Sequence, residues 1–320
     1  MSLRVSQSGN ECGEADLISK LCSMGVGGSI LRPSPKTSNV LRGHEGSVNA
    51  MCVSGSLLAT ASEDGTCRVW DAETRTLQAE MVGHAQYVNC IAMTEQWVVT
   101  GSADRTVRKW DLHTGRCVME FNGHKSVINQ LLVHENLLFS SSFDKTARQW
   151  SLLTGECLQV YKGHTRGVSP MLFVDLSLSD TRRERRKSRT RLIQQKNSTC
   201  SQFSVKMLLI TGAADNTARA WGIDSSASVV QYKGHGSGVL CLAANEGSRE
   251  LFTGSSDSTA RSWDIETGQP LRVFDGHQGA IVCIQVCLCT MFCMHALESA
   301  FRFAKKRYLI HGIWNRLICN

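Results

Sequence analysis

The sequence predicts an all-β protein made of repeated units of four short antiparallel strands. Two observations carry this prediction. Glycine-histidine pairs recur six times along the 320 residues, and five tryptophans follow them at regular distances. Short apolar runs, bounded by turn residues, lie between these markers. Runs of this length separated by turn signals at a fixed period are typical of strands in a repeat architecture.

Four residue types recur in register in five of the units. Each histidine is followed by a threonine or serine, then by an aspartate four residues further on, and each tryptophan lies six residues after that aspartate. From each tryptophan to the next histidine the distance is always 14 residues. The five sets are His44, Thr60, Asp64 and Trp70; His84, Thr100, Asp104 and Trp110; His124, Ser140, Asp144 and Trp150; His164, Thr211, Asp215 and Trp221; and His235, Thr253, Asp257 and Trp263.

The residues between these markers account for the four strands of each unit in order. An apolar run such as VNCIAM at 88–93 follows the Gly-His pair, and a second run precedes the aspartate. Between aspartate and tryptophan the residues alternate, as in TVRKW at 106–110. Thr-Gly pairs at 114–115, 154–155 and 267–268 then mark tight turns into a fourth strand.

These motifs resemble the WD40 repeat family, and more specifically a vertebrate WD-repeat protein. The Trp-Asp pair itself occurs at 70–71, 110–111 and 263–264, whereas Trp-Ser stands at 150–151 and Trp-Gly at 221–222. The resemblance implies a β-propeller in which each unit forms one blade. We count five complete blades and a partial sixth, which is incomplete beside the seven blades usual among relatives.

The pattern divides the chain into four kinds of segment. Residues 1–36 are polar and predict a flexible N-terminal segment, and residues 37–286 hold the repeats. Within the fourth unit, an insertion at 175–206 falls in the loop between the first and second strands, and a divergent tail occupies 287–320. The predicted blade units are 43–82, 83–122, 123–162, 163–233, 234–275 and the partial 276–286.

The resemblance implies a structural role for the recurring polar residues. In such blades the histidine, hydroxyl, aspartate and tryptophan form a buried hydrogen-bonded chain, which we call a tetrad. The alternative is a Ser-His-Asp catalytic triad. A triad is defined by one particular geometry rather than by repetition, so five copies at fixed spacing favour architecture. We therefore predict no enzyme activity, no catalytic residue, no metal and no cofactor.

The positive charge of the chain is concentrated in the insertion. The formal net charge is +7, and the segment 182–191 contributes +6 of it. A solvated loop is the leading interpretation, and a nuclear-localisation signal or a nucleic-acid contact are the alternatives. No aromatic residue is interleaved there to stack on bases, so nucleic acid is not favoured as a partner. The basic residues of this patch are Arg182, Arg183, Arg185, Arg186, Lys187, Arg189 and Arg191.

The cysteine content and the N-terminus predict an intracellular protein, cytoplasmic or nuclear or both. Fourteen cysteines are present, but the N-terminus lacks the apolar core of a signal peptide. Thiols that are not exported stay reduced. Several fall where a small buried apolar residue would serve, such as Cys90, Cys241 and Cys283.

The repeat pattern stops soon after Gly276-His277. We expect a truncation followed by an unrelated tail, and the alternative is a degenerate sixth blade with Phe303 at the tryptophan spacing. Residues 276–297 carry no Asp, Glu, Lys or Arg, yet a membrane span is not favoured because the segment begins as a repeat. Zinc at Cys283, Cys287, Cys289, Cys293 and His295 has only weak spacing support. An amphipathic helix over 300–317, which would lie on a membrane or bind calmodulin, is a further alternative.

Closure of the ring depends on the two ends of the repeat region. Residues 37–42 (TSNVLR) precede the first Gly-His pair as a fourth strand would, and this blade needs three partners from the C-terminal end. An unclosed ring would leave exposed strand edges.

The functional prediction is a scaffold or adaptor that binds a protein or peptide on one face of the propeller. The resemblance places contacts at the third and fifth positions after each histidine and at the residue before each aspartate. Nucleic-acid association through the insertion and a truncated regulatory form are the alternatives. The candidate protein-binding residues are Ser47, Asn49, Glu63, Tyr87, Asn89, Val127, Asn129 and Phe143.

Overall fold

The structure is a computed structural model that describes residues 4–5, 41–176, 207–245, 249–287, 290–297 and 300–306, with side chains described from 41 to 286 within these ranges. The described residues form strands, turns and extended links. In this part of the chain no helix is long and apolar enough to cross a membrane.

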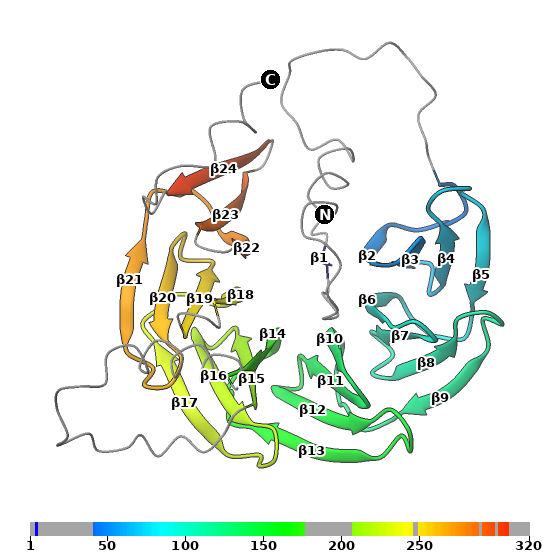
Figure 1. The fold of residues 1–320 in the computed structure, drawn as a ribbon, viewed down its shortest axis with the longest axis horizontal. Helices are drawn as coiled ribbons and strands as arrows, with labels where there is room; N and C mark the ends of the chain where they lie inside the picture. Colours follow the sequence, from blue (N-terminus) through cyan, green and yellow to red (C-terminus); the bar gives the residue numbers. More distant parts are fainter. Residues whose placement is uncertain are drawn as a thin grey trace, which may run out of the picture.

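Six sheets of sequential antiparallel strands follow one another around an arc (Figure 1). The strands of the five four-stranded units are β2 (Val48–Ser54), β3 (Leu57–Ser62), β4 (Cys67–Asp71) and β5 (Leu77–Met81); β6 (Val88–Met93), β7 (Trp97–Ser102), β8 (Val107–Asp111) and β9 (Cys117–Phe121); β10 (Ile128–His134), β11 (Leu137–Ser142), β12 (Thr146–Ser151) and β13 (Cys157–Lys162); β14 (Val168–Asp175), β15 (Met207–Ala213), β16 (Thr217–Gly222) and β17 (Ser228–Lys233); and β18 (Val239–Asn245), β19 (Glu250–Ser255), β20 (Ala260–Asp264) and β21 (Pro270–Phe274).

This architecture confirms the predicted all-β fold with five complete blades. The strands β2 to β21 fall, four by four, within the first five unit ranges that the repeat spacing defines. In the fourth sheet, Asp175 at the end of β14 pairs with Met207 at the start of β15. That pairing places residues 176–206 between the first and second strands of the sheet.

Burial changes from the inner to the outer strands of each sheet. The second strand is buried along almost its whole length, as in β7, where only Trp97 is half-buried. The fourth strand, as in β9, is mostly exposed. A strand that lies between two neighbouring sheets is covered on both faces and carries apolar or small residues throughout. The core is therefore not central but lies between the sheets.

Five apolar clusters hold the six sheets together, and each cluster joins two consecutive sheets. In the first, Ile91 and Met93 of β6 lie with Ala50 and Cys52 of β2. The next four clusters join the second sheet to the third, the third to the fourth, the fourth to the fifth and the fifth to the sixth. The tryptophan of each later unit belongs to the cluster shared with the preceding sheet, as Trp110 does.

Six sheets in a closed ring would have a sixth interface, between the last sheet and the first. The described residues form only the five clusters above, so the arc is open among them. In the first sheet, Met51 and Val53 hold the repeat positions of Ile91 and Met93, but no described sheet precedes them to cover their side chains. Met51 is half-buried and Val53 is 43% exposed, whereas Met93 is fully buried. Figure 1 shows the first and last sheets at the two ends of the arc.

The sixth sheet corrects the expectation of an unrelated tail after residue 286. Strand β22 (Ile281–Cys287) pairs with β23 (Thr290–Leu297), which pairs with β24 (Ala300–Lys306). The first strand also has the register shift, between Ile281 and Cys283, that the first strands of the other sheets share. Strands form here without the tetrad residues because backbone pairing needs only an available edge and a compatible chain. The same strands are inconsistent with a membrane-spanning helix over 276–297 and with a helix beginning at residue 300.

The first sheet has an additional short strand, and the predicted closing strand is not seen. Strand β1 (Arg4–Val5) pairs in parallel with β2. Of the predicted strand 37–42, residues 37–40 lie outside the described residues, and Leu41 and Arg42 belong to no strand. Within the described chain β24 therefore remains an edge strand.

Candidate interaction face and the tetrads beneath it

The structure brings the four recurring residues together in each of five sheets. The histidine comes from the link that precedes the first strand, the hydroxyl from the second strand, the aspartate from the following turn, and the tryptophan from the third strand. In all five, the distances from His Nδ1 to Asp Oδ2, from His Nε2 to the hydroxyl oxygen, and from Trp Nε1 to that oxygen are 2.7–2.9 Å.

The donors and acceptors of a tetrad are consistent with a neutral histidine. In the second sheet, His84 Nδ1–H donates to the Asp104 carboxylate, and Trp110 Nε1–H donates to the Thr100 hydroxyl oxygen. The Thr100 hydroxyl can then donate to the unprotonated Nε2 of His84. Every polar atom of this buried chain has a partner, which is the condition for such a network to stabilise a fold.

A threonine that the sequence pattern did not predict also bonds to the aspartate of each tetrad. The threonine two residues after each aspartate donates its backbone N–H and its hydroxyl to Asp Oδ1, as Thr106 does at 2.9 and 2.7 Å. The signal was available as Asp-x-Thr in all five units. The five threonines are Thr66, Thr106, Thr146, Thr217 and Thr259.

Each aspartate is held as a carboxylate by these donors. Burial alone would raise the pKa of Asp104, but the hydrogen bonds from Thr106 and His84 lower it to about 2. The pKa values of Asp64, Asp144, Asp215 and Asp257 are lowered for the same reasons. Burial lowers the pKa of His84 and of His235, although the adjacent aspartates act in the opposite direction.

The tetrads therefore predict loss of stability at acid pH in two stages. The folded pKa values of His84 and His235 lie below the usual 6.5, so the unfolded chain binds protons first as the pH falls through about 6.5. The folded pKa of Asp104 lies below the usual 3.8, so its stabilisation is complete above about pH 5 and is lost toward pH 2. Thermal melts from pH 8 to pH 3 should show a constant Tm above about pH 7, a gradual fall from about pH 6.5 and a steeper one below about pH 4. A Tm that rises between pH 7 and pH 5 would contradict this assignment.

The geometry does not offer a hydroxyl nucleophile to a substrate. Thr100 and Ser140 are fully buried, and each hydroxyl oxygen already accepts from a tryptophan. A reacting hydroxyl must lie beside a substrate as well as beside its base. The arrangement is therefore one of structural support for the loops above it.

These loops form one face of the arc, which we call the tetrad face. It consists of the links that carry each Gly-His pair and the turns between the second and third strands. Hydrogen bonds between the two kinds of loop fix its backbone: Ala103 N–H donates to Tyr87 O, and Phe143 N–H donates to Val127 O, at 3.0 and 3.1 Å. Each tetrad aspartate also accepts the backbone N–H that follows its histidine, as from Lys125 at 2.9 Å.

Two of the predicted binding residues are large exposed side chains on this face. Tyr87 is 42% exposed and Phe143 is 57% exposed. Glu63 is also exposed, whereas Ser47 and Val127 are half-buried. An exposed aromatic side chain on a backbone held by buried hydrogen bonds is a suitable anchor for a partner, because little entropy is lost when it is covered.

The three asparagines link neighbouring sheets. Asn49, Asn89 and Asn129 donate Nδ2–H to the backbone oxygen of a residue in the next sheet, at 3.0, 2.7 and 2.6 Å. Asn129 is 2% exposed and cannot present its amide to a ligand, so the prediction for this residue is wrong. The repeat of asparagine at this position is explained by links between sheets.

The remaining predicted sites fall largely outside the described residues. The basic patch 182–191 lies there, as do the side chains of Cys287, Cys289, Cys293 and His295. Cys283 and Cys241 are half-buried, Cys90 is buried, and none of the three is in a disulfide bond. Among the described residues no group of three or more His, Cys, Asp or Glu could hold a metal ion.

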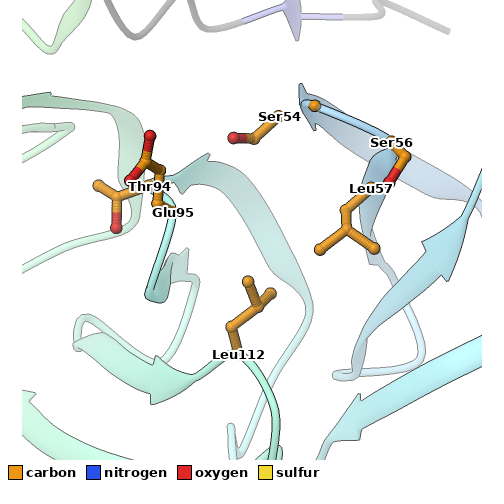
Figure 2. A pocket seen from close by; sticks show the side chains of 7 residues that line it. Ser54, Ser56, Leu57, Thr94, Glu95 and Leu112 are labelled. Atoms are coloured by element: carbon orange, nitrogen blue, oxygen red, sulfur yellow. The ribbon is translucent and has the colours of Figure 1, made fainter.

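A small hollow of about 280 Å³ lies on the opposite face of the arc, between the first two sheets. Figure 2 shows its lining, which comes from the turns after β2 and β6 and from Leu112. Glu95 is the one ionisable side chain of the lining. Neither its size nor its chemistry points to a small-molecule site, because ligand pockets are usually larger and combine apolar walls with several convergent polar groups.

Radial four-stranded sheets with buried tetrads define a β-propeller type of protein. Four segments of this chain, residues 35–71, 75–111, 115–151 and 226–264, match the family model described as WD domain, G-beta repeat. The chain therefore contains WD repeats, and most of the interrupted fourth unit and the sixth sheet lie outside the matched segments. The comparison with curated proteins found no match, and the similarity to one vertebrate protein stays a prediction.

Solved structures include many similar folds. One of them, a crystal structure of the computationally designed Ika8 protein, is 27% identical with a TM-score of 0.66. The similarity covers 82% of this chain and 72% of the designed chain. More than a quarter of the designed chain thus has no counterpart here.

Proposed function

We propose that this protein is a non-enzymatic scaffold or adaptor that binds a protein or peptide on its tetrad face. The observation that carries the proposal is the pair of exposed aromatic side chains, Tyr87 and Phe143, on loops whose backbone is fixed from below by the tetrads. WD repeats commonly serve as platforms for protein interactions, which supports the same role here. An intracellular location remains part of the proposal.

The test is capture of partners from a cell extract with the full chain and with a Tyr87→Ala, Phe143→Ala variant. We expect the amount of a reproducible set of captured proteins to be at least about ten-fold lower with this variant, because aromatic anchors carry much of an interface's binding energy. The matched control is Leu153→Ala, Leu158→Ala, which removes two side chains that are 67% and 48% exposed. Leu153 lies in the turn after β12, on the opposite face, and Leu158 lies on the outer strand β13.

A captured set that both variants retain would remove the tetrad face from the proposal. Quantitative mass spectrometry provides the measurement. Melting curves of both variants establish that they are folded.

A further inference from the structure

The tetrad face carries four basic side chains, which we call the basic arc: Arg105, Lys125, Lys145 and Arg166. All four are exposed. Among the described residues none of them forms an ion pair. Since they belong to three different sheets, no local stretch of sequence reveals them as a group.

Contacts at equivalent positions place these residues side by side along the arc. The residue after each tetrad aspartate lies against the Gly-His link of the next sheet. A Cβ atom on Gly65 would be 3.4 Å from the backbone oxygen of Gln86, and Asn216 Nδ2–H donates to Gly236 O at 3.2 Å. By the same repeat, Arg105 lies beside the 124–126 link that carries Lys125, and Lys145 lies beside the 164–166 link that carries Arg166.

Two further contacts connect the members of the arc. Lys125 and Lys145 flank the same aspartate, because Lys125 N–H donates to Asp144 Oδ2 and Lys145 follows Asp144. Phe143 extends from the third sheet onto the link of the fourth, where a Cβ atom on Gly167 would be 2.5 Å from its ring. An exposed aromatic ring therefore lies between the cations of the third and fourth sheets.

The conformation of two of these residues is unusual for a long side chain. Arg105 and Lys145 both have a φ of 73°. At the same repeat position the first sheet has Gly65 and the fourth has Asn216, residue types that adopt positive φ more readily. The two cations are held in this conformation at turns that project from the tetrad face.

The charge of the face differs between sheets. Where the third sheet has Lys125 and Phe143, the first sheet has Glu45 and Glu63, both exposed. The carboxylates of Asp104 and Asp144 lie beneath the arc and partly offset its charge. Their side chains, however, are only 9% and 7% exposed, and their oxygens accept hydrogen bonds within the tetrads. The accessible surface of the second to fourth sheets is therefore cationic, with an acidic region on the first.

We propose that the basic arc binds an acidic peptide segment of a partner protein, with an apolar side chain of that segment packed on Phe143. This inference rests on the proposed function and specifies its ligand. Carboxylates of a peptide can reach cations on adjacent loops, and such complementarity steers association. A nucleic acid fits less well, because an extended polyanion that crossed the face would meet Glu45 and Glu63.

The test measures fluorescence anisotropy of the full chain with three labelled probes. The first is a short peptide of glutamates around a central leucine pair, the second is the same peptide with glutamine in place of glutamate, and the third is a single-stranded oligothymidylate of equal charge. We expect saturable binding of the acidic peptide alone, weakened when the salt is raised from about 50 to about 200 mM. The glutamine peptide is expected not to bind.

Each variant for this test introduces the residue that another sheet of this chain has at the same repeat position. Lys125→Glu reproduces Glu45 of the first sheet, and Lys145→Asn reproduces Asn216 of the fourth, so both changes are compatible with the fold. Each should weaken binding of the acidic peptide, and together they should weaken it at least about ten-fold. Arg116→Glu is the matched control, because this exposed residue lies in the turn between β8 and β9 on the opposite face and the change in charge equals that of Lys125→Glu.

Three outcomes would overturn the inference: no binding of the acidic peptide, equal weakening by Arg116→Glu, or tighter binding of the oligothymidylate that depends on the arc. The last would assign the arc to nucleic acid. If the peptide fails to bind while the Tyr87 and Phe143 variant still loses captured proteins, the tetrad face remains the binding surface and only the acidic ligand is excluded. If the capture test fails while the basic arc binds the acidic peptide, Tyr87 and Phe143 are not the anchors of the captured proteins, and only the electrostatic part of the inference is retained.

Discussion

Asp104→Ala should lower the free energy of unfolding by about 3–5 kcal/mol. The carboxylate accepts four hydrogen bonds, from His84 Nδ1, from the backbone N–H of Ala85 and Thr106, and from the Thr106 hydroxyl. An alanine leaves all four donors without this acceptor in a largely buried site. Urea titration followed by tryptophan fluorescence measures the change.

Asp111→Ala is the control in the same sheet. Asp111 also accepts three hydrogen bonds, from the backbone N–H groups of His113 and Thr114 and from the Thr114 hydroxyl. These donors lie at an exposed turn, where water replaces the lost acceptor, so we expect a clearly smaller effect. Equal losses for the two variants would mean that the tetrad carboxylate contributes no more than a turn residue.

The second large effect tests the open arc. Met93→Ala should cost about 2–4 kcal/mol, whereas Val53→Ala should cost less than about 0.5 kcal/mol. The two residues hold the same position in their sheets, since Met93 pairs with Val98 as Val53 pairs with Leu58. Met93 is fully buried in the cluster between the first two sheets, and Val53 is 43% exposed.

The same urea titrations give the answer for both variants. Removing Met93 leaves a cavity between two sheets, and removing two methyl groups from Val53 changes little when no sheet covers it. If Val53→Ala were as costly as about 1.5 kcal/mol or more, the first sheet would be covered in solution and the arc would be closed by a further element.

The sequence was a good guide to local structure and a poor one to what each side chain contacts. Fixed spacing predicted the five sheets and the residues of each tetrad, because these depend on short strands and turns that repeat. It missed the tetrad threonines, although Asp-x-Thr recurs. It also assigned the asparagines to a ligand, because a side-chain amide can donate to any backbone oxygen, and Asn129 donates to Val168 of the next sheet.

The end of the repeat region shows a different limit. Residues 290–306 lack the motif residues and were expected to be an unrelated tail, yet they form β23 and β24. Motif residues report the tetrad, whereas strand pairing requires only an exposed edge such as that of β22. Loss of a tetrad is therefore not loss of a sheet.

By itself, the sequence determined the all-β class, the order of the strands and the positions of the recurring residues, since all of these follow from spacing within units of about forty residues, and the resemblance to WD40 repeats implied the tetrads. Tertiary structure alone decided which face of each sheet is covered, that the arc is open among the described residues, and that Arg105, Lys125, Lys145 and Arg166 lie together. These properties depend on contacts between sheets, where residues far apart in the chain become neighbours. A repeat period does not specify how one sheet packs on the next, or whether the last one reaches the first.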